Sequence, residues 1–164
     1  MTAGDASRIS AAFAEMGWSK PESQFVAYHA EQSANHILVF VAECDEEFAG
    51  YVTLRWESRY APFAESSIPE IKDLNVVKKF RRRGVATALM DEAEATAFSR
   101  GDEIGIGVGL HPGYGAAQRM YVRRGYLPDA RPLTYDNSPV SEGDTVRLDD
   151  KLVLQLTKLR PGAE

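Results

Sequence analysis

The chain has 164 residues, of which 44% are hydrophobic and 26% are charged, and its formal net charge is -5. This composition predicts one folded domain over residues 1–164 and is unlike that of a disordered chain. Because general nucleic-acid binders are usually basic, no nucleic-acid partner is expected.

The expected cellular location follows from two features that the sequence lacks. No apolar run approaches the ~18 residues of a membrane span, and the first ten residues lack the apolar core of a signal peptide. The sequence therefore predicts a cytoplasmic protein without a membrane partner. Cys44 is the single cysteine, so no intrachain disulfide forms, and its apolar surroundings predict a buried strand residue.

The first part of the chain is typical of two helices followed by a hairpin. Helices are predicted over residues 7–16 and 20–35. The apolar run 36–44 and the alternating segment 51–56 predict two strands joined by a turn over 45–50. Residues 57–69, with two prolines, predict a loop.

A third strand is predicted at residues 70–77, and its hydrophobic residues change face part-way. Ile71 has one parity, whereas Leu74 and Val76 have the other. Either both faces are buried or a bulge shifts the phase.

Crossover elements follow the third strand. A helix is predicted from Gly84 to Arg100, a strand at 103–110, a short helix at 116–124 and a closing strand at 152–159. Residues 127–150 predict an extended hairpin or a lid. The order of elements indicates an α/β or α+β fold with one mixed sheet.

Residues 78–83, "KKFRRR", form a basic cluster directly before Gly84 and the helix. A helix N-terminus offers unpaired N–H groups and a partial positive charge, which favour phosphate. Gly84 lets the chain approach a ligand closely. The segment therefore predicts a phosphate-binding loop, the alternative being a solvated basic turn. The segment lacks both the Walker spacing and the G-x-G-x-x-G spacing of dinucleotide-binding loops. The glycines at 105–109 are a weak dinucleotide signal, because no helix directly follows them.

Two segments resemble the signatures of the GNAT acyl-CoA N-acyltransferases. One is Arg81-x-x-Gly84-x-Ala86, and the other is Ala117-x-x-x-Tyr121-x-x-x-Gly125-Tyr126. The resemblance implies a single mixed, mostly antiparallel sheet flanked by helices, with acetyl-CoA as co-substrate and no metal. It departs from the family in two places: no strand is predicted before the first helix, and Tyr114 replaces a common Asn.

The resemblance also implies which residues bind the cofactor. Backbone amides of the basic loop hold the CoA pyrophosphate, and the third strand pairs with pantetheine as a neighbouring strand would. The residues expected to bind the cofactor are Leu74, Asn75, Val76, Arg81, Arg82, Arg83, Gly84, Val85, Ala86 and Thr87.

Two residues are candidates for proton transfer. The resemblance places Tyr121 at the CoA sulfur, where its phenol would protonate the leaving thiolate; its alternative role is packing in the core. Glu70, eleven residues before Arg81, is the candidate base. Three alternatives stay open: Glu70 is an exposed acid at a strand end, Asp73 is the base, or no single side chain is.

The sequence as a whole predicts an N-acetyltransferase that moves an acetyl group from acetyl-CoA directly to a primary amine in a ternary complex. The alternatives are a non-catalytic acyl-CoA sensor, a nucleotide-binding module, and the same fold acting with a longer acyl donor or a hydroxyl acceptor. The acceptor is not identified, and a homodimer is left open.

Overall fold

The structure, a computed structural model, describes residues 1–163. These residues form two compact units. The first unit contains residues 1–56 and 71–96, and the second contains residues 57–70 and the chain from residue 97 onward.

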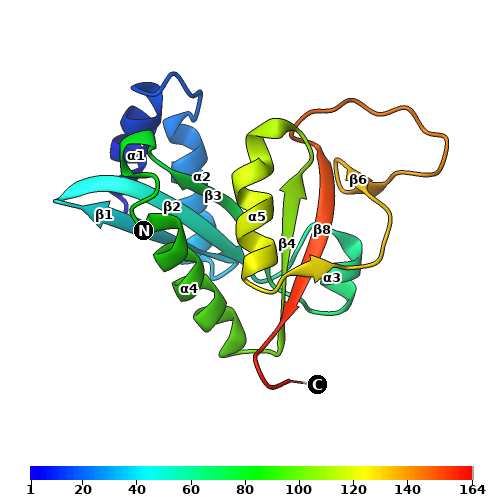
Figure 1. The fold of residues 1–164 in the computed structure, drawn as a ribbon. Helices are drawn as coiled ribbons and strands as arrows, with labels where there is room; N and C mark the ends of the chain where they lie inside the picture. Colours follow the sequence, from blue (N-terminus) through cyan, green and yellow to red (C-terminus); the bar gives the residue numbers. More distant parts are fainter. Residues whose placement is uncertain (164) are drawn as a thin grey trace. The chain divides into compact units, whose positions relative to one another are not determined.

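The first unit combines three strands with three α-helices. Its strands run in the order β1-β2-β3, and β1 pairs antiparallel with β2 from Ile37↔Arg55 to Cys44↔Glu47. The helices flank these strands (Figure 1). The elements, of which β3 and α4 extend slightly into the second unit, are α1 (Asp5–Ala14), α2 (Glu22–Ser33), β1 (Ile37–Cys44), β2 (Glu47–Arg55), β3 (Glu70–Val76) and α4 (Val85–Phe98).

Aromatic side chains form the core of the first unit. Phe13 of α1 lies with its ring centre 6.5 Å from that of Phe25 on α2 and 5.8 Å from that of Tyr51 on β2. All residues from Phe48 to Leu54 are buried, so both faces of β2 are covered. Burial of such large rings is a major favourable contribution to folding.

The second unit contains the remaining elements. Its strands run in the order β4-β8-β6-β7, β5 also pairs with β8, and the pairs that β8 makes with β4, β5 and β6 are antiparallel. The elements are α3 (Ala61–Glu65), β4 (Glu103–Gly109), α5 (Gly115–Arg123), β5 (Leu127–Pro128), β6 (Thr134–Tyr135), β7 (Ser138–Pro139) and β8 (Leu152–Leu159) (Figure 1).

Packing explains two of the glycines in β4. A Cβ at Gly105 would lie 2.2 Å from the ring of Phe63, and one at Gly109 would lie 2.4 Å from the ring of Tyr114. Both distances are far below van der Waals contact. These glycines therefore make room for aromatic rings within the second unit, which agrees with rejecting a dinucleotide-binding segment here.

The long predicted helices and strands are confirmed, with differences in the connections. The turn of the first hairpin contains only Asp45 and Glu46, both with positive φ, so β2 begins at Glu47 rather than at residue 51. Two-residue hairpin turns need this left-handed backbone because its twist matches that of the strands. Cys44 lies on β1 as predicted but is half-buried rather than buried.

The segment 57–69 was wrongly predicted to be a loop throughout. It contains α3, in which Pro62 occupies a first-turn position that proline tolerates and Phe63 is fully buried. In the predicted hairpin or lid at 127–150, strand pairing includes β5 with β8 and the short β6–β7 hairpin. Within residues 1–163 no strand precedes α1, as expected. In the same range no helix is both long and apolar enough to cross a membrane.

Candidate functional site

The third strand, β3, changes phase at one residue. Asp73 has φ 53, in the left-handed region, between residues assigned to the same strand. A left-handed residue inside a strand is how a bulge re-aims side chains, so the predicted irregularity of the strand is confirmed. Leu74, Asn75 and Val76 directly follow it and are half-buried.

The loop that leads into α4 has the backbone of an anion-binding turn. Arg82 and Gly84 have φ of 61 and 84, and the amide of Ala88 bonds the carbonyl of Gly84 at 3.0 Å. By helix geometry the amides of Val85 and Ala86, and that of the next residue, have no acceptor within α4. A Cβ at Gly84 would meet nothing within 4 Å, so open space lies beside this glycine. Both features fit a phosphate at this position.

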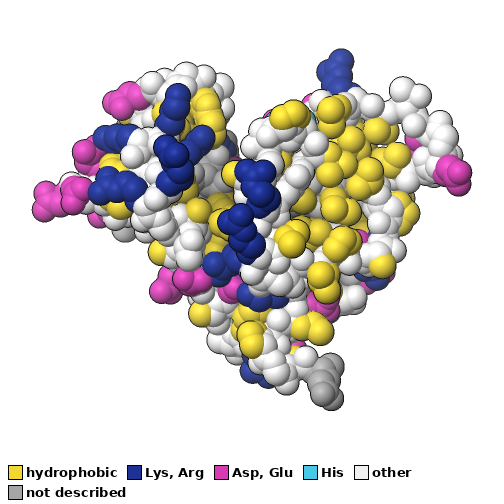
Figure 2. All heavy atoms as spheres, in the orientation of Figure 1, with side chains coloured by type: hydrophobic (Ala, Val, Ile, Leu, Met, Phe, Trp, Pro, Cys, Tyr) yellow, Lys and Arg dark blue, Asp and Glu magenta, His cyan; other side chains and the backbone are white. Residues whose placement is uncertain are grey.

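The basic side chains of the loop have neighbours of their own. Arg81 Nε donates to the carbonyl of Val76 at 3.2 Å, which ties the loop to the end of β3. Arg83 lies 3.7 Å from Asp45, and Lys79 forms an ion pair with Glu47. Acidic residues in the hairpin turn and at the start of β2 thus partly balance the positive cluster. Figure 2 shows dark-blue side chains gathered over the segment between β3 and α4.

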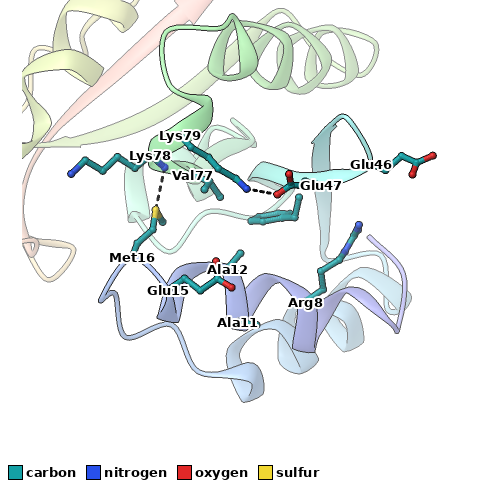
Figure 3. A pocket seen from close by; sticks show the side chains of 11 residues that line it. Arg8, Ala11, Ala12, Glu15, Met16, Glu46, Glu47, Val77, Lys78 and Lys79 are labelled. Atoms are coloured by element: carbon teal, nitrogen blue, oxygen red, sulfur yellow. Dashed lines mark hydrogen bonds and ion pairs between the residues drawn. The ribbon is translucent and has the colours of Figure 1, made fainter.

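A pocket of about 710 Å³ lies beside the 3-10 helix Lys78–Phe80. The sequence did not predict this short helix. Within it the amide of Lys78 donates to Met16 Sδ at 3.1 Å, and Lys79 pairs with Glu47 (Figure 3). Acidic and basic side chains share the pocket, and Gly84 is not part of its lining. The pocket therefore adjoins the basic segment without containing Gly84 or the start of α4.

The carboxylate of Asp73 is surrounded by donors from α2, β2, β3 and the link between α1 and α2. Its Oδ1 accepts from Lys20 Nζ at 2.8 Å and from Asn75 Nδ2 at 2.7 Å. Its Oδ2 accepts from Gln24 Nε2 at 3.1 Å, from the hydroxyl of Tyr28 at 3.0 Å and from the hydroxyl of Tyr51. This group, together with the ring of Phe13, is called the Asp73 cage; its members are Phe13, Lys20, Gln24, Tyr28, Tyr51, Asp73 and Asn75.

The negative charge of Asp73 affects the pKa of the two neighbouring tyrosines, Tyr28 and Tyr51. Burial, followed by the negative field of Asp73, raises the pKa of Tyr51 and of Tyr28. Both phenols therefore stay protonated at neutral pH and donate to the carboxylate. The cage keeps Asp73 supplied with hydrogen bonds and one compensating ammonium.

Glu70, the candidate base, has a different environment. It is only 1% exposed and accepts a hydrogen bond from Ser58 Oγ at 2.6 Å, within the second unit. Ser58 Oγ in turn accepts from the amide of Tyr60 at 3.0 Å. The alternative of an exposed acid at the strand end is therefore wrong.

Tyr121, the candidate acid, lies on α5 in the second unit. Its side chain is buried, its ring centre is 5.9 Å from that of Tyr126, and its carbonyl accepts from the amide of Tyr126 at 3.0 Å. Burial, with a smaller effect from Tyr114, raises the pKa of Tyr121. The phenol thus holds its proton at neutral pH, as a general acid requires, while its packing role is also real.

Residues 7–126 match the model of the Acetyltransferase (GNAT) family, which spans both sequence signatures. The chain belongs to the GNAT acetyltransferases. No curated protein matches it by sequence. The family implies acetyl-CoA and an acceptor substrate.

Solved structures share the fold of this GNAT protein at low identity. A protein assigned to the GNAT acetyltransferases of Desulfovibrio desulfuricans superposes with a TM-score of 0.70 at 16% identity, over 96% of this chain and 94% of its own. The ribosomal-protein-alanine N-acetyltransferase of Brucella melitensis gives 0.69 at 15% identity, over 97% and 96%. The ribosomal-protein-S18-alanine N-acetyltransferase of Escherichia coli gives 0.65 at 13%, over 96% and 88%. These likenesses show the GNAT fold, a mixed and mostly antiparallel sheet flanked by helices.

Tyr114, the departure from the family's usual Asn, has its own contacts in this GNAT chain. Its hydroxyl donates to Asp150 Oδ1 at 3.1 Å, and the same oxygen lies 2.9 Å from His111 Nε2. Because His111 Nδ1 accepts from the amide of Gly113, Nε2 carries the proton and donates to Asp150. Among residues 1–163 no group of His, Cys, Asp or Glu side chains could hold a metal ion.

The sequence did not identify the partners of Asp73. Lys20 lies in the link between α1 and α2, Tyr28 on α2 and Tyr51 on β2, at separations of 22 to 53 residues from Asp73. The local pattern gave one relevant signal, the phase change in β3 that made Asp73 the rival to Glu70. Nothing local connected that residue to a lysine so distant in the sequence.

Proposed function

We propose that this GNAT chain transfers an acetyl group from acetyl-CoA directly to a primary amine in a ternary complex. The observation that carries the proposal is the loop before α4, where Gly84 is left-handed beside open space at a helix start. A Cβ at Gly84 would touch no neighbouring atom, so close packing does not explain this glycine. The open space beside a helix start suits a bound phosphate.

Each part of the loop and of β3 has a role in binding. The amides from Arg82 to Thr87 donate to the CoA pyrophosphate, and exposed arginines add positive field. Leu74, Asn75 and Val76 pair with the pantetheine arm after the bulge at Asp73. The bound co-substrate supplies an acetyl group activated as a thioester.

Proton transfer falls to two side chains. Tyr121 keeps its proton at neutral pH and gives it to the departing sulfur. Glu70 takes the proton of the acceptor amine, directly or through a water, and Asp73 is its rival for that role. A non-catalytic sensor would keep the loop and release no thiol.

The test is an amine panel with acetyl-CoA, in which free thiol is measured. The panel should contain alkylamines, polyamines and peptides with an N-terminal alanine, because two structural neighbours are ribosomal-protein-alanine N-acetyltransferases. We expect amine-dependent thiol release above the rate of the amine-free control. Tight acetyl-CoA binding with no release for any amine would favour the sensor instead.

A further inference from the structure

The Asp73 cage holds a primary ammonium that belongs to the chain itself. Lys20 Nζ donates to Asp73 Oδ1 at 2.8 Å and to the Tyr51 hydroxyl at 2.9 Å. The same nitrogen lies 5.7 Å from the ring centre of Phe13 and 5.5 Å from that of Tyr51, within the range of cation–π attraction. A carboxylate, a hydroxyl and two aromatic rings around one nitrogen form a recognition site for a primary alkylammonium.

Lys20 is the one member of the Asp73 cage that does not lie on a helix or strand. It lies in the link 15–21 between α1 and α2, whereas Gln24 and Tyr28 are fixed on α2 and Tyr51 on β2. The side chain of Lys20 is 17% exposed and that of Asp73 is 23% exposed, so the ion pair borders solvent. Removing the ammonium would leave Asp73 with its other hydrogen-bond donors in place.

The cage adjoins the segment of β3 assigned to pantetheine. Asp73 directly precedes Leu74, and Asn75 within that segment also donates to Asp73. An ammonium in the cage and a thioester along residues 74–76 would therefore lie within a few residues of one strand. Direct transfer requires the amine nitrogen and the thioester carbon to come within about 3–3.5 Å, and a short separation along one strand favours that approach.

We propose that the Asp73 cage is the subsite that receives the acceptor's primary ammonium, and that Lys20 is an internal occupant that the acceptor displaces. This inference rests on the proposed function. The acceptor class is an unbranched primary alkylammonium, since the cage supplies a carboxylate and two ring faces. In the transfer the ammonium gives one proton to the proposed base, directly or through a water, and its lone pair forms the C–N bond as the C–S bond breaks. The nitrogen then loses its second proton to solvent, and the sulfur takes a proton from the proposed general acid.

Competition with Lys20 sets the size of the expected effect. A side chain tethered beside its own site has an effective concentration of about millimolar or more. A free amine therefore binds the wild-type cage weakly unless it makes further contacts. Removing Lys20 should raise the affinity for a small ammonium at least tenfold.

The first experiment is calorimetry with propylammonium chloride. Lys20→Ala deletes three methylene groups and the ammonium, so propylammonium matches the missing atoms. We expect this variant to bind propylammonium at least tenfold more tightly than the wild type does. Lys20→Met, which fills the same space without charge, should not bind it, and Lys151→Ala, which breaks the surface pair with Asp136, should behave as the wild type.

The second experiment measures thiol release with propylamine and acetyl-CoA. We expect kcat/KM for propylamine to be at least tenfold higher in Lys20→Ala than in the wild type. Adding Asp73→Asn to Lys20→Ala should abolish both the binding and the gain in rate.

Three results would overturn the inference. A folded Lys20→Ala variant that binds no propylammonium would show that the cage takes no external ammonium. Binding without any gain in propylamine turnover, while other amines still react, would separate the cage from the acceptor site. No thiol release with any amine would reject the proposed function and the acceptor role together, and the calorimetry would still decide whether the cage binds an ammonium.

Discussion

The loop before α4 and the Asp73 cage lie in the same unit and handle charge in opposite ways. In the loop, positive side chains are exposed, and pairs such as Lys79–Glu47 are more than half exposed at both partners. In the cage, one carboxylate is surrounded by neutral donors and a half-buried ammonium. Exposed pairs exchange at little cost, whereas an ion left without partners in a buried site is expensive. The loop is therefore ready for an anion, while the cage already contains the kind of ion it recognises.

The largest expected effect comes from Tyr121, which belongs neither to the loop before α4 nor to the Asp73 cage. It tests whether this residue carries out the proton transfer. Tyr121→Phe removes one hydroxyl and keeps the ring packed against Tyr126. If the hydroxyl protonates the leaving sulfur, kcat should fall about 10²-fold with acetyl-CoA affinity unchanged. Steady-state kinetics and calorimetry measure the two quantities. A wild-type kcat, with the chemical step shown to be rate-limiting, would leave Tyr121 with its packing role alone.

A substitution at Gly84 tests whether the loop before α4 binds the pyrophosphate of acetyl-CoA. Gly84→Asp places a negative charge beside the expected pyrophosphate and forces φ 84 on a residue with a Cβ. Acetyl-CoA affinity should fall at least tenfold, which corresponds to about 1.4 kcal/mol. Gly84→Asn is the matched control, because Asn tolerates the left-handed region and adds no charge.

Calorimetric titration of both Gly84 variants, each shown to be folded by circular dichroism, measures the difference. Unchanged affinity in a folded Gly84→Asp variant would argue that the phosphate binds elsewhere.

The two carboxylates of β3 should differ in how they change the rate with pH. Glu70→Gln should lower kcat a few-fold at neutral pH and recover at higher pH, where more amine is already neutral. Asp73→Asn should instead raise KM for the amine, since Asp73 binds the ammonium in the proposed cage. The pH–rate profiles of both variants with one amine measure this.

Two outcomes of the pH–rate comparison would change the assignment. Loss of the acid limb in Asp73→Asn, with Glu70→Gln retaining it, would make Asp73 the base. Retention of the limb in both variants would mean that no single side chain accepts the proton.

The smallest effect concerns the exposed pair at the loop. Glu47→Gln breaks the ion pair with Lys79, and both side chains are more than half exposed. The free energy of unfolding should change by less than about 0.5 kcal/mol, as for most exposed pairs. Urea unfolding measures it. A loss above about 1 kcal/mol would mean that the basic cluster is held in place by the start of β2.

How far the sequence predicted the site differs between the loop and the cage. The loop was predicted because its determinants are contiguous: a strand, a basic run, a glycine and a helix start. The cage was missed because Lys20, Tyr51 and Asp73 come from three distant segments. Their meeting depends on how α1, α2, β2 and β3 pack. Local periodicity carries no information about such contacts.

The sequence by itself determined the long helices and strands and the GNAT family, because these depend on hydrophobic period, glycine placement or short motifs. Only the tertiary structure decided that Glu70 is buried against Ser58 and that Asp73 holds the ammonium of Lys20. Burial and long-range ion pairing are properties of packed elements. Two carboxylates three residues apart on one strand therefore have environments that no local pattern could assign.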